Sequence, residues 1–248
     1  MNVLKYLKNI IKNRGAAFCV LIDPDKSDPD KLREFMDNND NGTVDALFIG
    51  SSLMMNDSFD RSIMKIKELS KVPVIIFPGS SIQVSKFADA ILFISLISGR
   101  NPHLLFGEHV LAAPVIKGKN IQTISTGYML IESGSVSTTE YISDTKPIPR
   151  NKSEIAVAHS LAAQFMGFET LYLEAGSGAP KPVPDEMITA VKKQISIPLI
   201  VGGGIKSPDT AGQKVKAGSD IIVIGNFLEN NWSRSLLQDF SNAIHFKQ

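Results

Sequence analysis

Short apolar runs rich in Val and Ile recur along the chain, and amphipathic segments separate most of them. There are eight such runs, at residues 16–22, 45–50, 72–77, 89–94, 121–131, 170–174, 198–203 and 220–226. Nearly continuous apolar runs are typical of strands buried on both faces, as in a parallel sheet. Eight strands alternating with helices in 248 residues predict an α/β fold, a (β/α)8 TIM barrel formed by one domain over residues 1–248. A doubly wound open sheet is the alternative.

The segments between the apolar runs differ in how strongly they predict helices. Apolar residues at helical spacing predict helices over residues 28–39, 56–71, 101–117, 152–167, 182–195 and 207–218, and from Phe227 to the end of the chain. Residues 78–88 leave little room for a full helix, so we expect the third helix to be short or missing. Residues 133–151 are polar and too long for an ordinary turn. This segment is either a functional lid or a surface insertion.

Composition excludes several classes of protein. The net charge of +1 offers no electrostatic footprint for nucleic acid. The single cysteine, Cys19, rules out an internal disulfide and is expected in the core. No apolar run approaches the ~18 residues of a membrane span, and the first 15 residues lack the pattern of a signal peptide. We therefore expect a cytoplasmic protein.

Glycines follow the last two predicted strands. The seventh apolar run leads into Gly203 and Gly204, and the eighth leads into Gly225 and Asn226. In a barrel these loops are adjacent at the carboxyl end, where active sites lie and where such loops bind phosphate. Their backbone amides and the helix N-termini that follow favour an anion. A flexible turn without a ligand is the alternative for either loop alone.

The sixth predicted strand ends in an acidic residue and a third glycine loop. Its sequence is "YLEAGSGAP", residues 172–180, with Glu174 at the junction. Glycines let backbone N–H groups approach a ligand closely, yet Glu174 is itself an anion. The pairing indicates a site that binds a phosphate and also requires a base.

The first predicted strand ends in "LIDPDK" and places Asp23 at the mouth of the barrel. One or two protein oxygens are enough to hold Mg²⁺, which completes its coordination with water and substrate phosphate. Asp23 is therefore a candidate magnesium ligand. A helix cap without a metal is the alternative.

Five motifs together carry a family resemblance over nearly the whole chain. They are "LIDPDK" (21–26), "FIGSS" (48–52), "YLEAGSGAP" (172–180), "VGGGI" (201–205) and "IGN" (224–226). In order and position they resemble the geranylgeranylglyceryl phosphate synthase family. The resemblance implies a modified (β/α)8 barrel without a regular third helix. It also implies a Mg²⁺-dependent reaction in which the 3-hydroxyl of sn-glycerol 1-phosphate displaces diphosphate from a long prenyl diphosphate, such as geranylgeranyl diphosphate, in ether-lipid synthesis.

The resemblance assigns roles residue by residue. Asp23 and Ser52 match the magnesium positions. The reaction that the resemblance implies makes Glu174 and Tyr172 the catalytic candidates. Glu174, at the strand end, can accept the proton of the glycerol hydroxyl, and Tyr172 can either hold the glycerol or shield the allylic cation. The glycerol-phosphate positions match Tyr172, Leu173, Glu174, Ala175, Gly176, Ser177, Gly178, Gly203, Gly204, Gly225 and Asn226. One branch of the family has a lysine at the position of Leu21, so lysine roles do not transfer, and either Lys26 or Arg100 is left as a candidate for the diphosphate.

The remaining expectations concern the prenyl chain, partners and other functions. Candidates for the wall of a prenyl groove are Phe93, Leu96, Ile97, Tyr128 and Leu130, each of which could also be ordinary core. We expect a homo-oligomer, with transient membrane contact for the lipid product. Two alternatives stay open. One is another phosphate-binding barrel enzyme, of the sugar-phosphate isomerase or thiamin-phosphate synthase type, and the other is a non-enzymatic sensor of a phosphate ligand.

Overall fold

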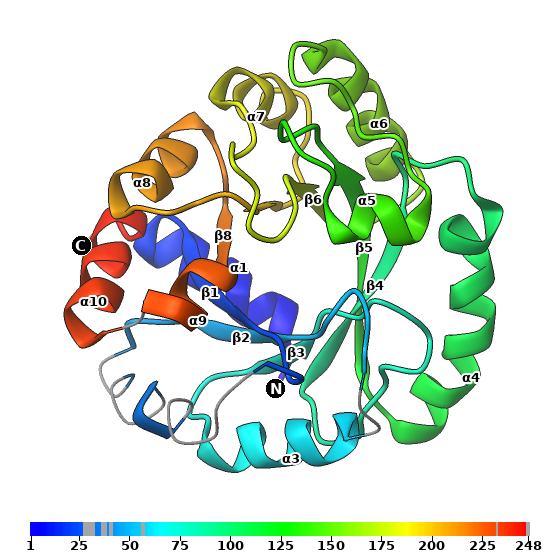
Figure 1. The fold of residues 1–248 in the computed structure, drawn as a ribbon, viewed down its shortest axis with the longest axis vertical. Helices are drawn as coiled ribbons and strands as arrows, with labels where there is room; N and C mark the ends of the chain where they lie inside the picture. Colours follow the sequence, from blue (N-terminus) through cyan, green and yellow to red (C-terminus); the bar gives the residue numbers. More distant parts are fainter. Residues whose placement is uncertain (27–32, 36–38, 40–41, 56–57, 232, 247–248) are drawn as a thin grey trace.

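Eight parallel strands close into a barrel with helices around it, as Figure 1 shows for a computed structural model of the chain. The structure describes residues 1–26, 33–35, 39, 42–55, 58–231 and 233–246. The strands are β1 (Ala17–Ile22), β2 (Ala46–Ile49), β3 (Val74–Ile76), β4 (Ala90–Leu96), β5 (Gln122–Leu130), β6 (Thr170–Glu174), β7 (Leu199–Gly202) and β8 (Ile221–Ile224). Each pairs with the next, and β8 pairs with β1. The predicted barrel is confirmed, and the open sheet is wrong.

The helices of the described residues surround this barrel. They are α1 (Val3–Arg14), α3 (Phe59–Leu69), the π-helix η1 (His103–Gly107), α4 (Glu108–Lys119), α5 (Thr138–Ser143), α6 (Ser153–Phe165), α7 (Asp185–Lys192), α8 (Pro208–Ala217), α9 (Asn226–Asn231) and α10 (Arg234–Ile244). The helix predicted over residues 28–39 lies largely outside the described residues. None of the helices in the described part of the chain has the length and apolar character that crossing a bilayer requires.

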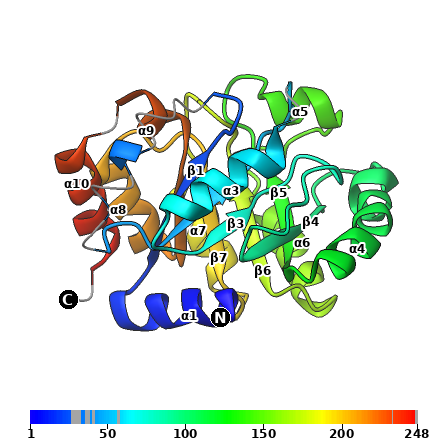
Figure 2. The same cartoon turned by 90° about the horizontal axis from the view of Figure 1, so that it is seen from below.

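Two apolar clusters hold the barrel together. The larger cluster fills the layer between strands and helices, and the smaller one fills the barrel interior. Helix α1 closes the amino-terminal end, because Val3, Leu4 and Leu7 join the interior cluster. Figure 2 shows α1 across this end and α5 and α9 at the other. Cys19 is buried in the interior, as predicted.

The link between β3 and β4 contains no helix among residues 77–89, which confirms the expected gap. A buried glutamine organises this link instead. The Gln83 side chain donates to the Ser51 carbonyl (2.8 Å) and accepts from the Gly79 amide (3.2 Å). Residues 78–81 and Val84 of this link line a cavity at the barrel mouth together with residues of α4.

The polar segment over residues 133–151 is partly ordered as a helix that the sequence did not predict. Ser137 caps α5, since its side chain accepts from the Glu140 amide. An isolated parallel bridge between Ile131 and Ile148 ties the two ends of the segment together. Thr139, Ile142 and Ser143 line a cavity at the barrel mouth. The segment is thus part of a cavity wall and not merely a surface insertion.

Candidate active site

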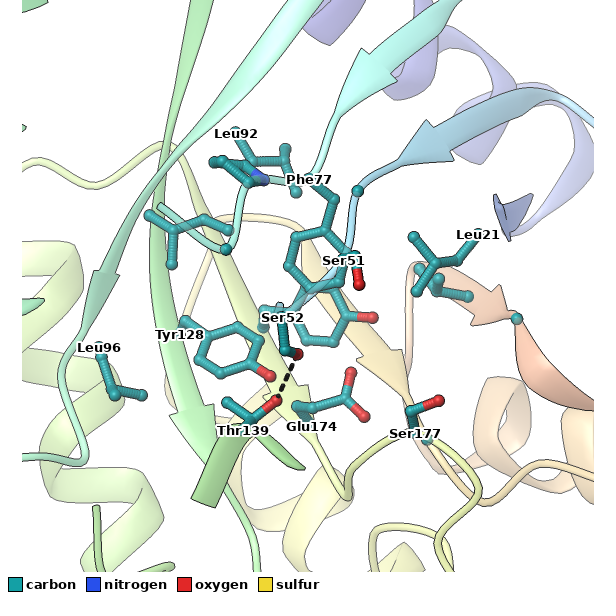
Figure 3. Close-up of a pocket in the computed structure, with 18 of the residues that line it drawn as sticks. Leu21, Ser51, Ser52, Phe77, Leu92, Leu96, Tyr128, Thr139, Glu174 and Ser177 are labelled. Carbon is teal, nitrogen blue, oxygen red and sulfur yellow. Dashed lines mark hydrogen bonds between the residues drawn. The ribbon is translucent and has the colours of Figure 1, made fainter. Parts of the chain in front are cut away.

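A cavity of about 380 Å³ lies at the carboxyl ends of the strands. Loops after β2, β3, β6, β7 and β8 line it, and side chains of β4, β5, α4 and α5 extend it to one side. In Figure 3, Glu174 lies between Ser177 on one side and Tyr128 on the other, with Leu96 beyond Tyr128. This is the end at which barrels of this type carry their active sites.

The polar half of the cavity consists of Glu174, residues 177–178, residues 203–206 and residues 225–226. Gly178, Gly203 and Gly204 have φ angles of 68°, 81° and 69°, a region that favours glycine. A Cβ on Gly203 would lie 2.3 Å from Glu174 Oε1 and 2.7 Å from the Gly176 nitrogen. Glycine is therefore required at 203 because the β6 and β7 loops pack against each other, before any ligand is considered.

Glu174 is the last residue of β6, and its carboxylate is buried inside the cavity wall. Its Oε1 accepts a 2.6 Å hydrogen bond from the Gly176 amide. Burial raises the pKa of Glu174 to about 7, while the Gly176 amide and the nearby Tyr172 hydroxyl act to lower it. A carboxylate tuned near neutral pH is suited to general-base catalysis.

Tyr172 points into the barrel two residues before Glu174 and is fully buried. Its ring stacks on Phe77, with centroids 5.2 Å apart. Its hydroxyl oxygen is buried close to the Glu174 carboxylate, and among the described residues no group forms a hydrogen bond of good geometry with it. A Cβ on Gly202 would lie 2.2 Å from this hydroxyl and 3.0 Å from Glu174 Oε2, so Gly202 makes room for both polar groups. An unpaired hydroxyl beside a carboxylate is available to a ligand.

Three of the residues predicted to contact glycerol phosphate do not line the cavity. Strand alternation turns Leu173 and Ala175 outward, where both join the cluster between barrel and helices. Gly176 lies behind Glu174 and bonds its carboxylate. The structure brings the other predicted glycerol-phosphate residues to the cavity wall, namely Tyr172, Glu174, Ser177, Gly178, Gly203, Gly204, Gly225 and Asn226.

Asp23 follows β1 and lies behind the cavity wall among oxygen atoms and one ammonium group. Its Oδ2 accepts from Ser51 Oγ (3.2 Å) and from Lys26 Nζ (2.8 Å). Its amide donates to Glu229 Oε1 at 2.8 Å. Burial, together with the charge of Asp23, raises the pKa of Glu229. The oxygen atoms of Asp23, Ser51 and Glu229 are suitable ligands for a hard cation, since Mg²⁺ needs only one or two protein carboxylates. The Lys26 ammonium on Asp23 shows that this position already accommodates a positive charge.

Ser52 lies on the cavity wall, but its hydroxyl is engaged. Ser52 Oγ and Thr139 Oγ1 are 3.1 Å apart, and this hydrogen bond joins the β2 loop to α5 (Figure 3). Ser51, its neighbour, is the serine that bonds Asp23 directly. No group of three or more His, Cys, Asp or Glu side chains arranged for a metal occurs among the described residues.

The apolar half of the cavity consists of residues 91–94 and Leu96 of β4, Tyr128 of β5, and Leu104, His109, Ala112 and Ile116 of η1 and α4. Of the predicted groove residues, Phe93, Leu96 and Tyr128 line the cavity. Ile97 and Leu130 do not; Leu130 is fully buried and Ile97 packs against the outer cluster. The apolar half lies where the third helix is missing.

The structure also changes the list of candidate cations and adds residues that sequence reasoning missed. Arg100 donates to the Gly99 carbonyl and faces His159, outside the cavity, whereas Lys206, which the sequence did not single out, lines the cavity.

Three further residues of the site, Gly202, Phe77 and Thr139, were not predicted from the sequence. Gly202 stands within the "GGG" motif and had a local signal. Phe77 and Thr139 had none, because their neighbours in space are distant in sequence.

Comparison with known proteins agrees with this geometry. The PcrB family profile matches residues 8–244. The chain belongs to the PcrB family. Within this family it is 44% identical over 229 residues to geranylgeranylglyceryl phosphate synthase of Chitinophaga pinensis, covering 92% of this chain and 90% of the relative. It is 46% identical over 230 residues to the enzyme of the same name from Thermococcus kodakarensis, covering 91% and 90%.

Solved structures give the same result. The crystal structure of (S)-3-O-geranylgeranylglyceryl phosphate synthase from Thermoplasma acidophilum, in complex with its substrate sn-glycerol-1-phosphate, superposes with a TM-score of 0.92 at 32% identity over 99% of both chains. Thiamine phosphate pyrophosphorylase from Pyrococcus furiosus superposes with a TM-score of 0.58 at 13% identity, over 93% of this chain and 96% of that one. The second likeness concerns the barrel fold alone.

Proposed function

We propose that the chain is a prenyltransferase that joins the 3-hydroxyl of sn-glycerol 1-phosphate to a long-chain prenyl diphosphate, geranylgeranyl diphosphate, and releases diphosphate. The observation that carries this function is the position of Glu174. Its buried carboxylate lies between glycine loops suited to a phosphate and an apolar half suited to a hydrocarbon chain. Membership of the PcrB family and the names of its relatives support the same reaction.

The geometry accounts for binding of both substrates. The loops after β6, β7 and β8 line the cavity, and their backbone amides can hold the phosphate, as in other barrels. The apolar half buries the prenyl chain at roughly 0.8 kcal/mol per methylene group. The two halves meet at Glu174 and Tyr172. Bound in this way, the 3-hydroxyl of the glycerol would lie near the end of the chain that reacts.

Proton transfer then requires a base at this junction. The glycerol oxygen attacks the first carbon of the prenyl group, the bond from that carbon to diphosphate breaks, and the hydroxyl proton passes to Glu174. A pKa of about 7 leaves a substantial ionised fraction at neutral pH. The Tyr172 hydroxyl lies beside Glu174, forms no hydrogen bond of good geometry within the described part of the chain, and can orient the glycerol.

We further propose that Asp23 and Ser52 hold a Mg²⁺ ion. Bound there, the ion would neutralise charge on the departing diphosphate. The oxygen atoms around Asp23 and the nearby Lys26 ammonium support a cation site. Lys206, which lines the cavity, is a second positive group within reach of an anionic substrate.

Exposed apolar side chains support two further proposals, that the protein forms a homo-oligomer and that it contacts a membrane transiently. Phe106, Val110, Leu111 and Val115 are exposed on η1 and α4, which supports a homo-oligomer. Leu53 and Ile82 are exposed on the loops after β2 and β3, and Ile142 is exposed on α5, which supports transient membrane contact. Sedimentation of the wild type and of Leu111→Asp tests the homo-oligomer, which the variant is expected to disrupt. Flotation with anionic vesicles tests the membrane contact. A monomeric wild type, or a protein that never floats, contradicts the respective proposal.

A turnover assay tests the function. Purified protein is incubated with Mg²⁺, geranylgeranyl diphosphate and labelled sn-glycerol 1-phosphate, and label extracted into organic solvent is measured. We expect a prenylated glycerol phosphate and free diphosphate. The enantiomer sn-glycerol 3-phosphate serves as the control and is expected to react poorly. Absence of lipid product with prenyl donors of every length would contradict the proposal and favour a sensor.

A further inference from the structure

The buried side chain of Gln83 joins the loops after β2 and β3 at the barrel mouth. Gln83 is only 1% exposed, although its side chain is polar. Its Nε2 donates to the Ser51 carbonyl (2.8 Å), and its Oε1 accepts from the amides of Gly79 (3.2 Å) and Ser51 (3.4 Å). Gln83 therefore bonds both the carbonyl and the amide of Ser51. We call residues 50–52 the serine loop.

The serine loop packs directly against the loop after β3, and a glycine on each side makes this contact possible. A Cβ on Gly50 would lie 1.8 Å from the Phe77 carbonyl oxygen, and a Cβ on Gly79 would lie 2.2 Å from the Ser51 carbonyl oxygen. Neither position leaves room for a side chain. The two backbones are therefore in contact, and Gln83 holds them together with hydrogen bonds.

The amide of Gln83 matches the backbone groups that it meets. A neutral carboxamide supplies an acceptor and two donors at once, whereas a carboxylate only accepts and an apolar side chain does neither. Gln83 belongs to the link between β3 and β4, which contains no helix among residues 77–89. In a regular barrel a helix at this point would pack against the outside of the strands. Here part of the link packs against the serine loop instead.

The serine loop carries two groups of the proposed magnesium site. Ser51 Oγ donates to Asp23 Oδ2 (3.2 Å), and Ser52 is itself a proposed ligand. Both serines line the cavity, whereas Gln83 does not (Figure 3). Loss of a partner that holds a metal ligand in place typically lowers metal affinity by about 10–100-fold. Gln83 is placed to act in this way, through the backbone of the loop.

We propose that Gln83 is a positioning residue that sets Ser51 and Ser52 in the arrangement that Mg²⁺ requires. It contacts neither the substrates nor the ion, and it fixes the backbone that presents both hydroxyl groups. This inference rests on the proposed magnesium site at Asp23 and Ser52. It gives the link that replaces the third helix a task in the reaction.

Binding of inorganic diphosphate, a product of the proposed reaction, tests the positioning role without turnover. Diphosphate is titrated into the protein by calorimetry, once in excess Mg²⁺ and once in EDTA. Gln83→Met keeps the length of the side chain but removes the three hydrogen bonds. We expect it to raise the Kd measured with Mg²⁺ about tenfold. The Kd measured in EDTA and the Kd for sn-glycerol 1-phosphate should stay unchanged.

Gln164→Met is the matched control. Gln164 of α6 also accepts from backbone amides of a loop, those of Ser196 (2.7 Å) and Ile197 (3.4 Å), and it does not line the cavity. This variant should change none of the three Kd values. Gln83→Asn keeps the amide but is one methylene group shorter, and it should weaken Mg²⁺-dependent binding as Gln83→Met does. It serves as the second variant if Gln83→Met does not fold.

A mutant cycle separates positioning from a general effect on the fold. In a background that carries Ser51→Ala and Ser52→Ala, Gln83→Met should change the Kd measured with Mg²⁺ by less than about twofold, because the positioned hydroxyl groups are gone. A full tenfold loss in that background, or an unchanged Kd in Gln83→Met alone, overturns the inference and leaves the proposed function standing. If the wild type binds diphosphate no better with Mg²⁺ than in EDTA, the magnesium proposal fails and the inference fails with it.

Discussion

In the polar half of the cavity the backbone supplies the contacts, whereas in the apolar half side chains supply them. Gly178, Gly203 and Gly204 adopt left-handed φ angles and line the cavity without a side chain. Leu96, Tyr128 and Ile116 instead present hydrocarbon and aromatic surface from β4, β5 and α4. A backbone site accepts no added Cβ, while a side-chain wall can change its shape residue by residue. The difference indicates that recognition of phosphate is rigid in this fold and recognition of the chain is adaptable.

The largest effect is expected at the junction of the two halves. Glu174→Gln keeps the size of the side chain but removes the base, so the single-turnover rate should fall by about 10²–10⁴-fold with affinity for glycerol phosphate almost unchanged. In the wild type, kcat/KM should decline below about pH 7, where Glu174 takes up its proton. Glu169→Gln, just before the start of the same strand, is the control. A fall smaller than about tenfold would leave Glu174 as a positioning residue.

A pair of glycine variants tests whether the backbone of the polar half excludes an added Cβ, with a glycine outside the cavity as the reference. Gly203→Ala forces a Cβ to within 2.3 Å of Glu174 Oε1 and should lower turnover about 100-fold, because the base is displaced. Gly118→Ala lies on α4 with no atom within 4 Å of the added Cβ, and it should leave turnover unchanged while stabilising the helix by about 0.5–1 kcal/mol. Single-turnover rates and thermal unfolding measure both. Equal losses in the two variants would refute a specific requirement for glycine at position 203.

Removal of the proposed magnesium ligands, Asp23 and Ser52, is expected to affect turnover less than the changes at Glu174 and Gly203. Asp23→Asn and Ser52→Ala should each raise the Mg²⁺ concentration for half-maximal turnover by about tenfold, with little change in glycerol-phosphate binding. Thr139→Val is matched to Ser52→Ala, because it removes the same hydrogen bond and leaves the Ser52 oxygen in place. If Thr139→Val shifts the Mg²⁺ requirement as much as Ser52→Ala does, the role of Ser52 is to join the β2 loop to α5.

The smallest effect concerns stability. Folding raises the pKa of Glu174 from 4.5 to about 7, so the folded protein binds more protons than the unfolded chain between these values. Its stability therefore falls as pH rises through this window, and the full cost, roughly 1–3 kcal/mol, is present above pH 7. Glu174→Gln should accordingly be more stable than the wild type at pH 8 and equal to it near pH 4. Urea unfolding at both pH values measures the difference; a variant that is less stable at pH 8 contradicts it.

Much of the polar half of the cavity could be predicted from local sequence. The run over residues 170–174 predicted β6 with its observed bounds, because a parallel strand buried on both faces is apolar throughout. The acidic residue at the end of β6 and the glycine loops after β6, β7 and β8 could be assigned to one site, because the carboxyl ends of barrel strands meet at one rim. The family resemblance also assigned Leu173 and Ala175 to the glycerol-phosphate site, and alternation within β6 turns the side chains of both away from the cavity.

The apolar half was recovered less completely. Tyr128 and Leu96 were among the predicted groove residues, but so were Ile97 and Leu130, which lie outside the cavity. Any apolar residue at a strand end has the same sequence signature whether it lines a cavity or the core. Phe77 ends the third apolar run like any strand residue, and only its stacking on Tyr172 distinguishes it.

The sequence by itself determined the eight strands, the barrel, the gap after the third strand and the rim that holds Glu174, because periodicity, glycine and chain order are local properties. The tertiary structure decided the rest. It placed Thr139 against Ser52, 87 residues earlier in the chain. It also enclosed Glu174 so completely that burial raises its pKa to about 7. Desolvation depends on every atom around a group, and those atoms come from strands that meet only when the barrel closes.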